Sequence, residues 1–241
     1  MRKGKKGFTL IELMIVIAII AIIAAIAIPG LLSSQRASNE RNASTSLKTL
    51  ASAEADFRAN DRDWNHVNDF WTFDVRGLYS LTSAAVSGAT ANSTTDPAIK
   101  LIELSVASAD GDSAVPTTTE YSNITNFAVP SAKAGYWYQA LIADDTLGTA
   151  NLEATYALDT GGQPGMGSVH NTSKFGFCSY PDSQSAGKYV FIVNENNTIF
   201  RSATTGAVRA STSNPPGTLT LTAYSHWPND SDLKSYWSKL D

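Results

Sequence analysis

The sequence predicts an α+β protein in which one long amino-terminal helix carries a globular head built on an antiparallel β-sheet. Residues 13–28 are only Leu, Ile, Val, Met and Ala, and no ionisable residue occurs between Leu13 and Gln35. Beyond residue 60, short apolar runs alternate with turns rich in Gly, Asn and Ser, a pattern typical of strands. The 241 residues therefore divide into a short basic segment at 1–7, a helix at 8–60 and a head at 61–241.

The apolar run is long enough to cross a membrane. Residues 8–28, about 21 positions at about 1.5 Å each, span roughly 30 Å as a helix, which is the thickness of a bilayer core. Lys and Arg flanking such a helix stay on the cytoplasmic side, and the preceding segment carries Arg2, Lys3, Lys5 and Lys6. We therefore expect a single-pass protein of the cytoplasmic membrane, with the chain after Pro29 outside.

A cleavable secretory signal is the alternative interpretation of this segment. Ala25-Ile26-Ala27 offers a suitable cleavage site, but Glu12 stands where such a signal normally carries only apolar residues. An acid within a spanning helix is costly, so it marks a functional residue. A cut between Gly7 and Phe8 would create an α-amino group four residues before Glu12, on the same helix face, where the two charges can neutralise each other.

Residues 7–13, Gly-Phe-Thr-Leu-Ile-Glu-Leu, closely resemble the prepilin signal of bacterial type IV pilins and type II secretion pseudopilins. The resemblance covers about the first fifty residues. It implies a pilin-like fold, cleavage after Gly7 by a prepilin peptidase, N-methylation of Phe8 and retention of the apolar segment. It also implies an assembly role for the motif residues Thr9 and Glu12, because the matching acid of that family pairs with the amino terminus of an adjacent subunit.

The helix is expected to continue beyond the membrane to about residue 60. An amphipathic stripe recurs there at spacings of 3 and 4, formed by Ala43, Leu47, Leu50, Glu54 and Phe57. We expect residues 8–30 to form the membrane or filament core and 31–60 to pack on the head. A solvated face opposite the stripe carries Arg36, Glu40, Arg41, Lys48, Asp56 and Arg58.

Pro29 and Gly30 match the helix-interrupting position of the resembled family. Pro29 removes an amide donor and clashes with the carbonyl of Ala25, so the helix should bend or loosen there. A simple kink and a local melting during assembly are both compatible with this position.

The head is expected to contain strands at 100–107, 136–143, 152–158, 174–180, 188–193 and 198–202. Turn residues at 194–197 make the last two a hairpin, and a strand at 207–210 would extend it to a meander. Segment 61–81 is expected to be a loop with short helical turns that anchors the head onto the helix through aromatic residues, namely Trp64, Phe70, Trp71, Phe73 and Tyr79. Residues 227–241 are expected to cap the sheet.

The head shows no catalytic pattern, so we expect a protein that is not an enzyme. His66, His170 and His226 lack a paired spacing, and Cys178 lies in a strand-like run typical of a buried structural thiol. No metal site is predicted. Calcium is the alternative left open for the acidic pairs of Asp110-Gly111-Asp112 and Asp144-Asp145, since some pseudopilins bind it in their heads, although neither pair fits an EF-hand loop.

Charge and cysteine content exclude further classes. Four of the 18 Lys and Arg lie in residues 1–6, so the remaining chain, with 22 Asp and Glu, carries a net charge of −8. Nucleic acid is therefore excluded as the main partner. A single cysteine cannot form the C-terminal disulfide of many type IV pilins, which leaves pilin and pseudopilin open. Glycosylation sequons begin at Asn92, Asn123 and Asn171.

The predicted function is that of a filament subunit, stored in the cytoplasmic membrane and polymerised through its amino-terminal helix into a cell-surface or periplasmic fibre. Its expected partners are copies of itself or related subunits, the prepilin peptidase, the membrane and an external ATP-driven assembly machine. A type II secretion pseudopilin is the first alternative. A membrane-anchored sensor or binding protein, whose helix is only a tether, is the alternative of another class.

Overall fold

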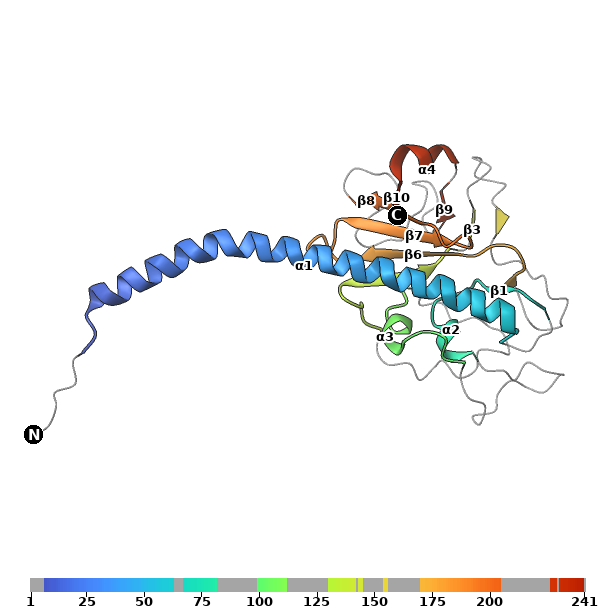
Figure 1. The fold of residues 1–241 in the computed structure, drawn as a ribbon, viewed down its shortest axis with the longest axis horizontal. Helices are drawn as coiled ribbons and strands as arrows, with labels where there is room; N and C mark the ends of the chain where they lie inside the picture. Colours follow the sequence, from blue (N-terminus) through green and yellow to red (C-terminus); the bar gives the residue numbers. More distant parts are fainter. Residues whose placement is uncertain are drawn as a thin grey trace, which may run out of the picture.

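The computed structural model describes residues 7–62, 67–81, 99–111, 130–141, 143–144, 154–155, 170–204, 226–228 and 230–240. Helix α1 (Leu10–Asn60) is a curved rod whose first half projects from the head, while its second half lies along the sheet (Figure 1). The predicted α+β fold with a long amino-terminal helix is confirmed.

Helix α1 begins two residues later than expected and ends where predicted. Thr9 is its N-cap, in extended conformation at φ −83° and ψ 151°. Asp61 closes it in the left-handed region, at φ 45° and ψ 61°, and donates its backbone N–H to the carbonyl of Phe57. The helix runs through Pro29 without ending there.

The predicted stripe is the face that α1 buries. Its buried residues, all from position 43 onward, are Ala43, Ser46, Leu47, Leu50, Ala51, Ala53, Glu54 and Phe57. They pack against strands of the main sheet and against aromatic residues of the 67–81 segment, where Phe70 and Trp71 are buried and Phe73 and Tyr79 partly buried. The predicted anchoring role is therefore confirmed for these four aromatic residues; Trp64 lies outside the described residues.

The main sheet is antiparallel, in the order β10-β8-β7-β6-β2. Its strands are β2 (Tyr136–Ala140), β6 (Gly176–Pro181), β7 (Tyr189–Asn194), β8 (Ile199–Ala203) and β10 (Ser238–Leu240). The predicted hairpin is present as β7 and β8, with Val193 opposite Ile199 and Asn197 at φ 53° in the turn.

Both faces of β7 are buried, which explains its continuous apolar sequence. Phe191 and Val193 belong to the core that includes α1. Val190 and Ile192 point to a second cluster, formed with Leu141, Cys178, Tyr180, Trp227 and Trp237.

Smaller elements surround this sheet. Strand β1 (Phe70–Trp71) pairs with β5 (His170–Asn171), and β3 (Ala143–Asp144) pairs with both β4 (Ala154–Thr155) and β9 (His226–Trp227). The short helices are α2 (Gly77–Ser80), α3 (Leu104–Ala107) and α4 (Asp230–Tyr236). Figure 1 shows α4 and α3 on opposite sides of the head. Segment 61–81 contains the expected helical turn, α2, but also the unpredicted strand β1.

The strand predicted at 100–107 is wrong, because Leu104–Ala107 forms helix α3. Ile102 and Val106 are buried at 5% and 2% exposure, whereas Leu104, between them, is 48% exposed. Ile102 lies before the helix and Val106 within it, so the alternation of apolar residues did not reflect a strand.

Three further strand predictions are tested only in part or not at all. Segment 136–143 is interrupted after Ala140, and 152–158 is described only at β4. The expected strand at 207–210 lies outside the described residues, and β10 occupies the free edge of β8. The C-terminal segment therefore extends the sheet with an edge strand instead of only capping it.

Leu47→Ala should lower the free energy of unfolding by about 2–5 kcal/mol, because this fully buried side chain fills the contact between α1 and the sheet. Urea denaturation of the full chain in mild detergent, followed by tryptophan fluorescence, would measure it. The neighbouring exposed residue provides the control, and Lys48→Ala should stay within about 0.5 kcal/mol of the parent. Equal effects of the two substitutions would contradict the assigned packing.

Candidate assembly site

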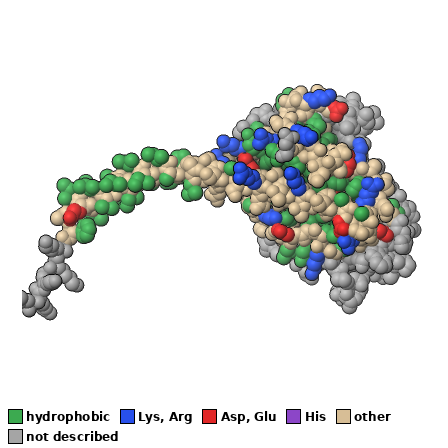
Figure 2. Space-filling model, viewed as in Figure 1, with side chains coloured by type: hydrophobic (Ala, Val, Ile, Leu, Met, Phe, Trp, Pro, Cys, Tyr) green, Lys and Arg blue, Asp and Glu red, His purple; other side chains and the backbone are tan. Residues whose placement is uncertain are grey.

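The first half of α1 exposes a continuous apolar surface. Large hydrophobic side chains from Phe8, 84% exposed, to Leu32, 48% exposed, lie outside any core. Mean hydropathy reaches 3.1 over an 18-residue window that is 0% buried, which is long and apolar enough to cross a membrane. Figure 2 shows these hydrophobic side chains along the projecting half of α1. Apolar surface of this extent marks a contact with lipid or with other protein.

Thr9 and Glu12 are brought together at the start of this surface. Oε2 of Glu12 accepts hydrogen bonds from the backbone N–H of Thr9, at 2.8 Å, and from its hydroxyl, at 2.7 Å. The Glu12 N–H donates in return to Thr9 Oγ1, at 3.3 Å. This capping box satisfies backbone N–H donors that the first helical turn leaves free. It also holds the Glu12 carboxylate beside Thr9, next to Phe8 in the chain.

Gly7 and Phe8 precede the helix and are both exposed. Apart from Gly7 itself and its chain neighbours, no atom of the described residues lies within 4 Å of the position that a Gly7 Cβ would take. The peptide bond between them is therefore open to an approaching enzyme. Arg2, Lys3, Lys5 and Lys6 lie outside the described residues.

Around Pro29 the helix has local features that the sequence analysis missed. The hydroxyls of Ser33 and Ser34 both donate to the carbonyl of Gly30, at 2.9 and 3.0 Å. Serine bonding back to the preceding turn often bends a helix, and Pro29 lacks an amide donor in the same region. Serines three and four residues after Gly30 were the signal that could have indicated this.

Comparison with known proteins identifies this segment. Residues 2–28 match the family model described as the prokaryotic N-terminal methylation motif. The amino-terminal segment is therefore similar to that of type IV pilins. The chain is also 36% identical over 85 residues to the type IV major pilin protein PilA of Myxococcus xanthus (strain DK1622), a match that covers 34% of this chain and 39% of that protein. No solved structure matches this chain.

Where α1 meets the head, polar side chains bind the loop between β6 and β7. Arg36 Nε donates to the carbonyl of Ser185, at 3.2 Å, and Asn39 Nδ2 to that of Ala186, at 3.0 Å. Glu40 Oε1 accepts the backbone N–H of Lys188, at 2.9 Å. The face predicted to be only solvated therefore also positions the head at this point.

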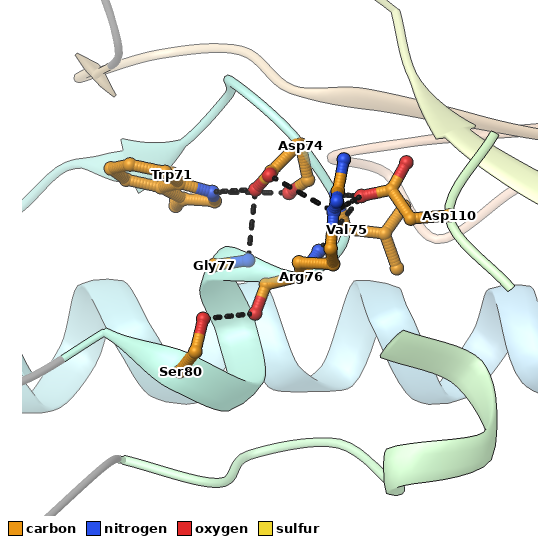
Figure 3. A network of polar contacts seen from close by, with 7 residues as sticks. All are labelled: Trp71, Asp74, Val75, Arg76, Gly77, Ser80 and Asp110. Carbon is orange, nitrogen blue, oxygen red and sulfur yellow. Dashed lines mark hydrogen bonds and ion pairs between the residues drawn. The ribbon is translucent and has the colours of Figure 1, made fainter. Parts of the chain in front are cut away.

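Asp110 lies within a polar network that includes Asp74 and Arg76 (Figure 3). Its Oδ2 accepts the backbone N–H groups of Val75 and Arg76, at 2.9 and 3.0 Å. The guanidinium Nε of Arg76 lies 3.4 Å from the same oxygen and 3.8 Å from Oδ2 of Asp74. Asp110 is 3% exposed, so it serves an internal ion pair.

Asp74 extends this network to α2. Its Oδ1 accepts the indole N–H of Trp71, at 3.1 Å, and the N–H of Gly77, at 2.8 Å (Figure 3). A Cβ on Gly77 would collide with the Trp71 indole, so only glycine permits this approach.

The acidic residues considered as alternative calcium ligands do not form a metal site in the described part of the chain. There, no group of three or more His, Cys, Asp and Glu could hold a metal ion. Asp112 and Asp145 lie outside the described residues, and the side chain of Asp144 is not described. Calcium stays the untested alternative to the prediction of no metal site.

The remaining candidates of the head are buried or undescribed. Cys178 is fully buried in β6, as predicted, and burial raises the pKa of its thiol, which disfavours the reactive thiolate. His170 is 2% exposed in β5; His66 and the side chain of His226 are not described.

Asn171 is 3% exposed. Its Oδ1 accepts from the N–H and hydroxyl of Ser173 and from the N–H of Lys174. This sequon is thus turned inward, while Asn92 and Asn123 lie outside the described residues.

Asp110→Ala should lower the free energy of unfolding by about 3–5 kcal/mol, because it leaves Arg76 and two backbone amides without their buried acceptor. Urea denaturation of the full chain would measure the loss. Glu103→Ala removes an exposed acid paired with Lys133 and should cause no measurable loss. A tolerated Asp110→Ala would show that the network does not stabilise the head.

Proposed function

We propose that this chain is the structural subunit of a type IV pilus-like filament, stored in the cytoplasmic membrane and polymerised through the first half of α1. One observation carries the proposal. The methylation motif opens an unburied apolar half-helix, in which Glu12 is the single ionisable residue before Arg36.

Moving such a helix from lipid into a bundle of like helices is nearly neutral hydrophobically, so close packing and charge pairing must supply selectivity. Small residues for close packing are Ala18, Ala21, Ala24, Ala25 and Ala27. A head-to-tail contact that repeats without closing produces a helical fibre.

The capping box supports a role for Glu12 in this packing. Both hydrogen bonds from Thr9 end on Oε2, so Oε1 is open to a further donor. We assign that place to the amino group of Phe8 of an adjacent subunit, created when the prepilin peptidase cuts after Gly7 and methylated afterwards. The head would then face outward, and an external machine would drive assembly.

A type II secretion pseudopilin is a second candidate, with which the cysteine content is compatible. Cys178 is a free, buried thiol, so no internal disulfide closes the C-terminal region. Pairing of β10 with β8 and the apolar cluster around Trp227 and Trp237 hold that region instead.

Mass spectrometry of the protein isolated from its native membrane should give a chain of residues 8–241 with one added methyl group on Phe8. The exposed Gly7–Phe8 bond and the matched methylation motif lead to this expectation. An intact Met1, or a cut after Ala27, would contradict the prepilin processing.

Glu12→Gln should reduce sheared surface filaments, counted by electron microscopy, to less than about a tenth of the parent level, with normal membrane insertion. The amide retains an acceptor for the capping box but cannot pair with an ammonium group, so this variant separates capping from charge. Glu103→Gln, which changes an exposed acid of the head, should assemble normally. Normal filaments from Glu12→Gln would show that charge pairing is not required for assembly.

A further inference from the structure

Three titratable side chains are buried together near the end of α1. Glu54 of α1 is 0% exposed, Asp69 before β1 is 1% exposed, and His170 of β5 is 2% exposed. None belongs to the assembly site. Burying several ionisable groups costs free energy unless they form hydrogen bonds or ion pairs.

These groups fasten the segment 67–81 to the helix. Glu54 Oε2 accepts the backbone N–H of Trp71, at 3.0 Å. Asp69 Oδ1 lies 3.2 Å from His170 Nδ1, and Trp71 is directly opposite His170 in the pairing of β1 with β5. Glu54 therefore binds β1 to α1, and Asp69 holds the partner strand β5 through His170.

Aromatic rings pack against His170. The His170 ring stacks on Phe57, with centroids 6.3 Å apart, and meets Trp71 edge-on at 5.4 Å. Trp71 is itself fully buried. Arg58, one turn after Glu54, places its guanidinium 4.8 Å from the Phe70 ring centroid.

Burial raises the pKa of Glu54 well above its ordinary value of 4.5. The N–H of Trp71 and a protonated His170 oppose this rise in the pKa, and the charge of Asp69 adds to it. Among the described residues Glu54 Oε1 has no hydrogen-bond partner, so an ionised carboxylate would be poorly compensated there.

We propose that Glu54, Asp69 and His170 form a proton-operated latch, which fastens residues 67–81 to α1 while Glu54 is neutral and weakens when Glu54 ionises. The neutral acid is favoured in the closed state. The stabilisation is therefore complete below the ordinary pKa of the acid and is lost as the pH rises through the raised pKa of the folded protein. The latch is a property of the single chain and does not depend on the proposed filament.

Hydrogen–deuterium exchange of the full chain in detergent micelles, between pH 5 and 9, would test this latch. After correction for the intrinsic exchange rates, opening of residues 67–81 should increase about tenfold per pH unit wherever Glu54 is neutral when closed and ionised when open. Peptides from β6, β7 and β8 report whether the sheet stays folded. A parent profile that is flat with pH would overturn the proposal.

Glu54→Gln should give a much shallower profile than the parent, because the amide oxygen can still accept from Trp71 but cannot ionise. Glu103→Gln is the control and should keep the parent slope, since Glu103 is an exposed acid whose pKa is lowered by hydrogen bonds from Lys133 and Ser105. A parent-like slope in Glu54→Gln would overturn the latch.

A second measurement needs no variant. The carboxyl carbon of ¹³C-labelled Glu54 should titrate, by NMR, with a midpoint clearly above 4.5. A midpoint at or below that value would also overturn the proposal.

Discussion

The structure depends on the burial of one stripe of α1 against the main sheet. The stripe starts at Ala43, and Leu47, Leu50 and Phe57 continue it with almost no exposed surface. β7 lies against this face. On its other side, Val190 and Ile192 of β7 pack in the second apolar cluster, which includes Trp227 and Trp237. A layered core of this kind gives the head its stability without disulfides, because the apolar area removed from water supplies the main driving force.

Since the sheet covers α1 only from position 43 onward, the earlier apolar half must find its surroundings elsewhere. Its large hydrophobic side chains from Phe8 to Leu32 are exposed in the described chain, and a bilayer or a bundle of copies provides the apolar environment that water does not. One continuous helix therefore joins two environments. The bonds of Arg36, Asn39 and Glu40 to the β6–β7 loop hold the head where the helix passes from one to the other.

Buried polar groups determine how the connecting segments lie on this core. Asp110 and Asp74 bind backbone amides at the start of α2, and Glu54 binds the amide of Trp71. Glu54 and Asp110 accept from backbone N–H groups far from them in the sequence, and Asp74 accepts from one across a tight turn. Each contact fixes the position of one residue in an otherwise irregular segment. Such contacts contribute specificity, while apolar burial contributes most of the stabilising free energy.

Much of the fold follows from local pattern. The sequence predicted the apolar half of α1, its buried stripe from Ala43 onward and the hairpin of β7 and β8. These features were predictable because helical periodicity, strand alternation and turn residues act between near neighbours in the chain. The joining of Thr9 and Glu12 is likewise a contact across one helical turn.

Tertiary structure alone decided the contacts between distant segments. The pairing of β10 with β8 and of β1 with β5 depends on how the whole chain closes around α1, so no local pattern indicates it. For the same reason Glu40 was expected to be only solvated, and Asp110 was considered as a calcium ligand, whereas the fold gives them a backbone amide and Arg76 as partners. Sequence established which residues are polar or apolar; the assembled core determined which of the polar ones met a partner, because that depends on distances across the fold.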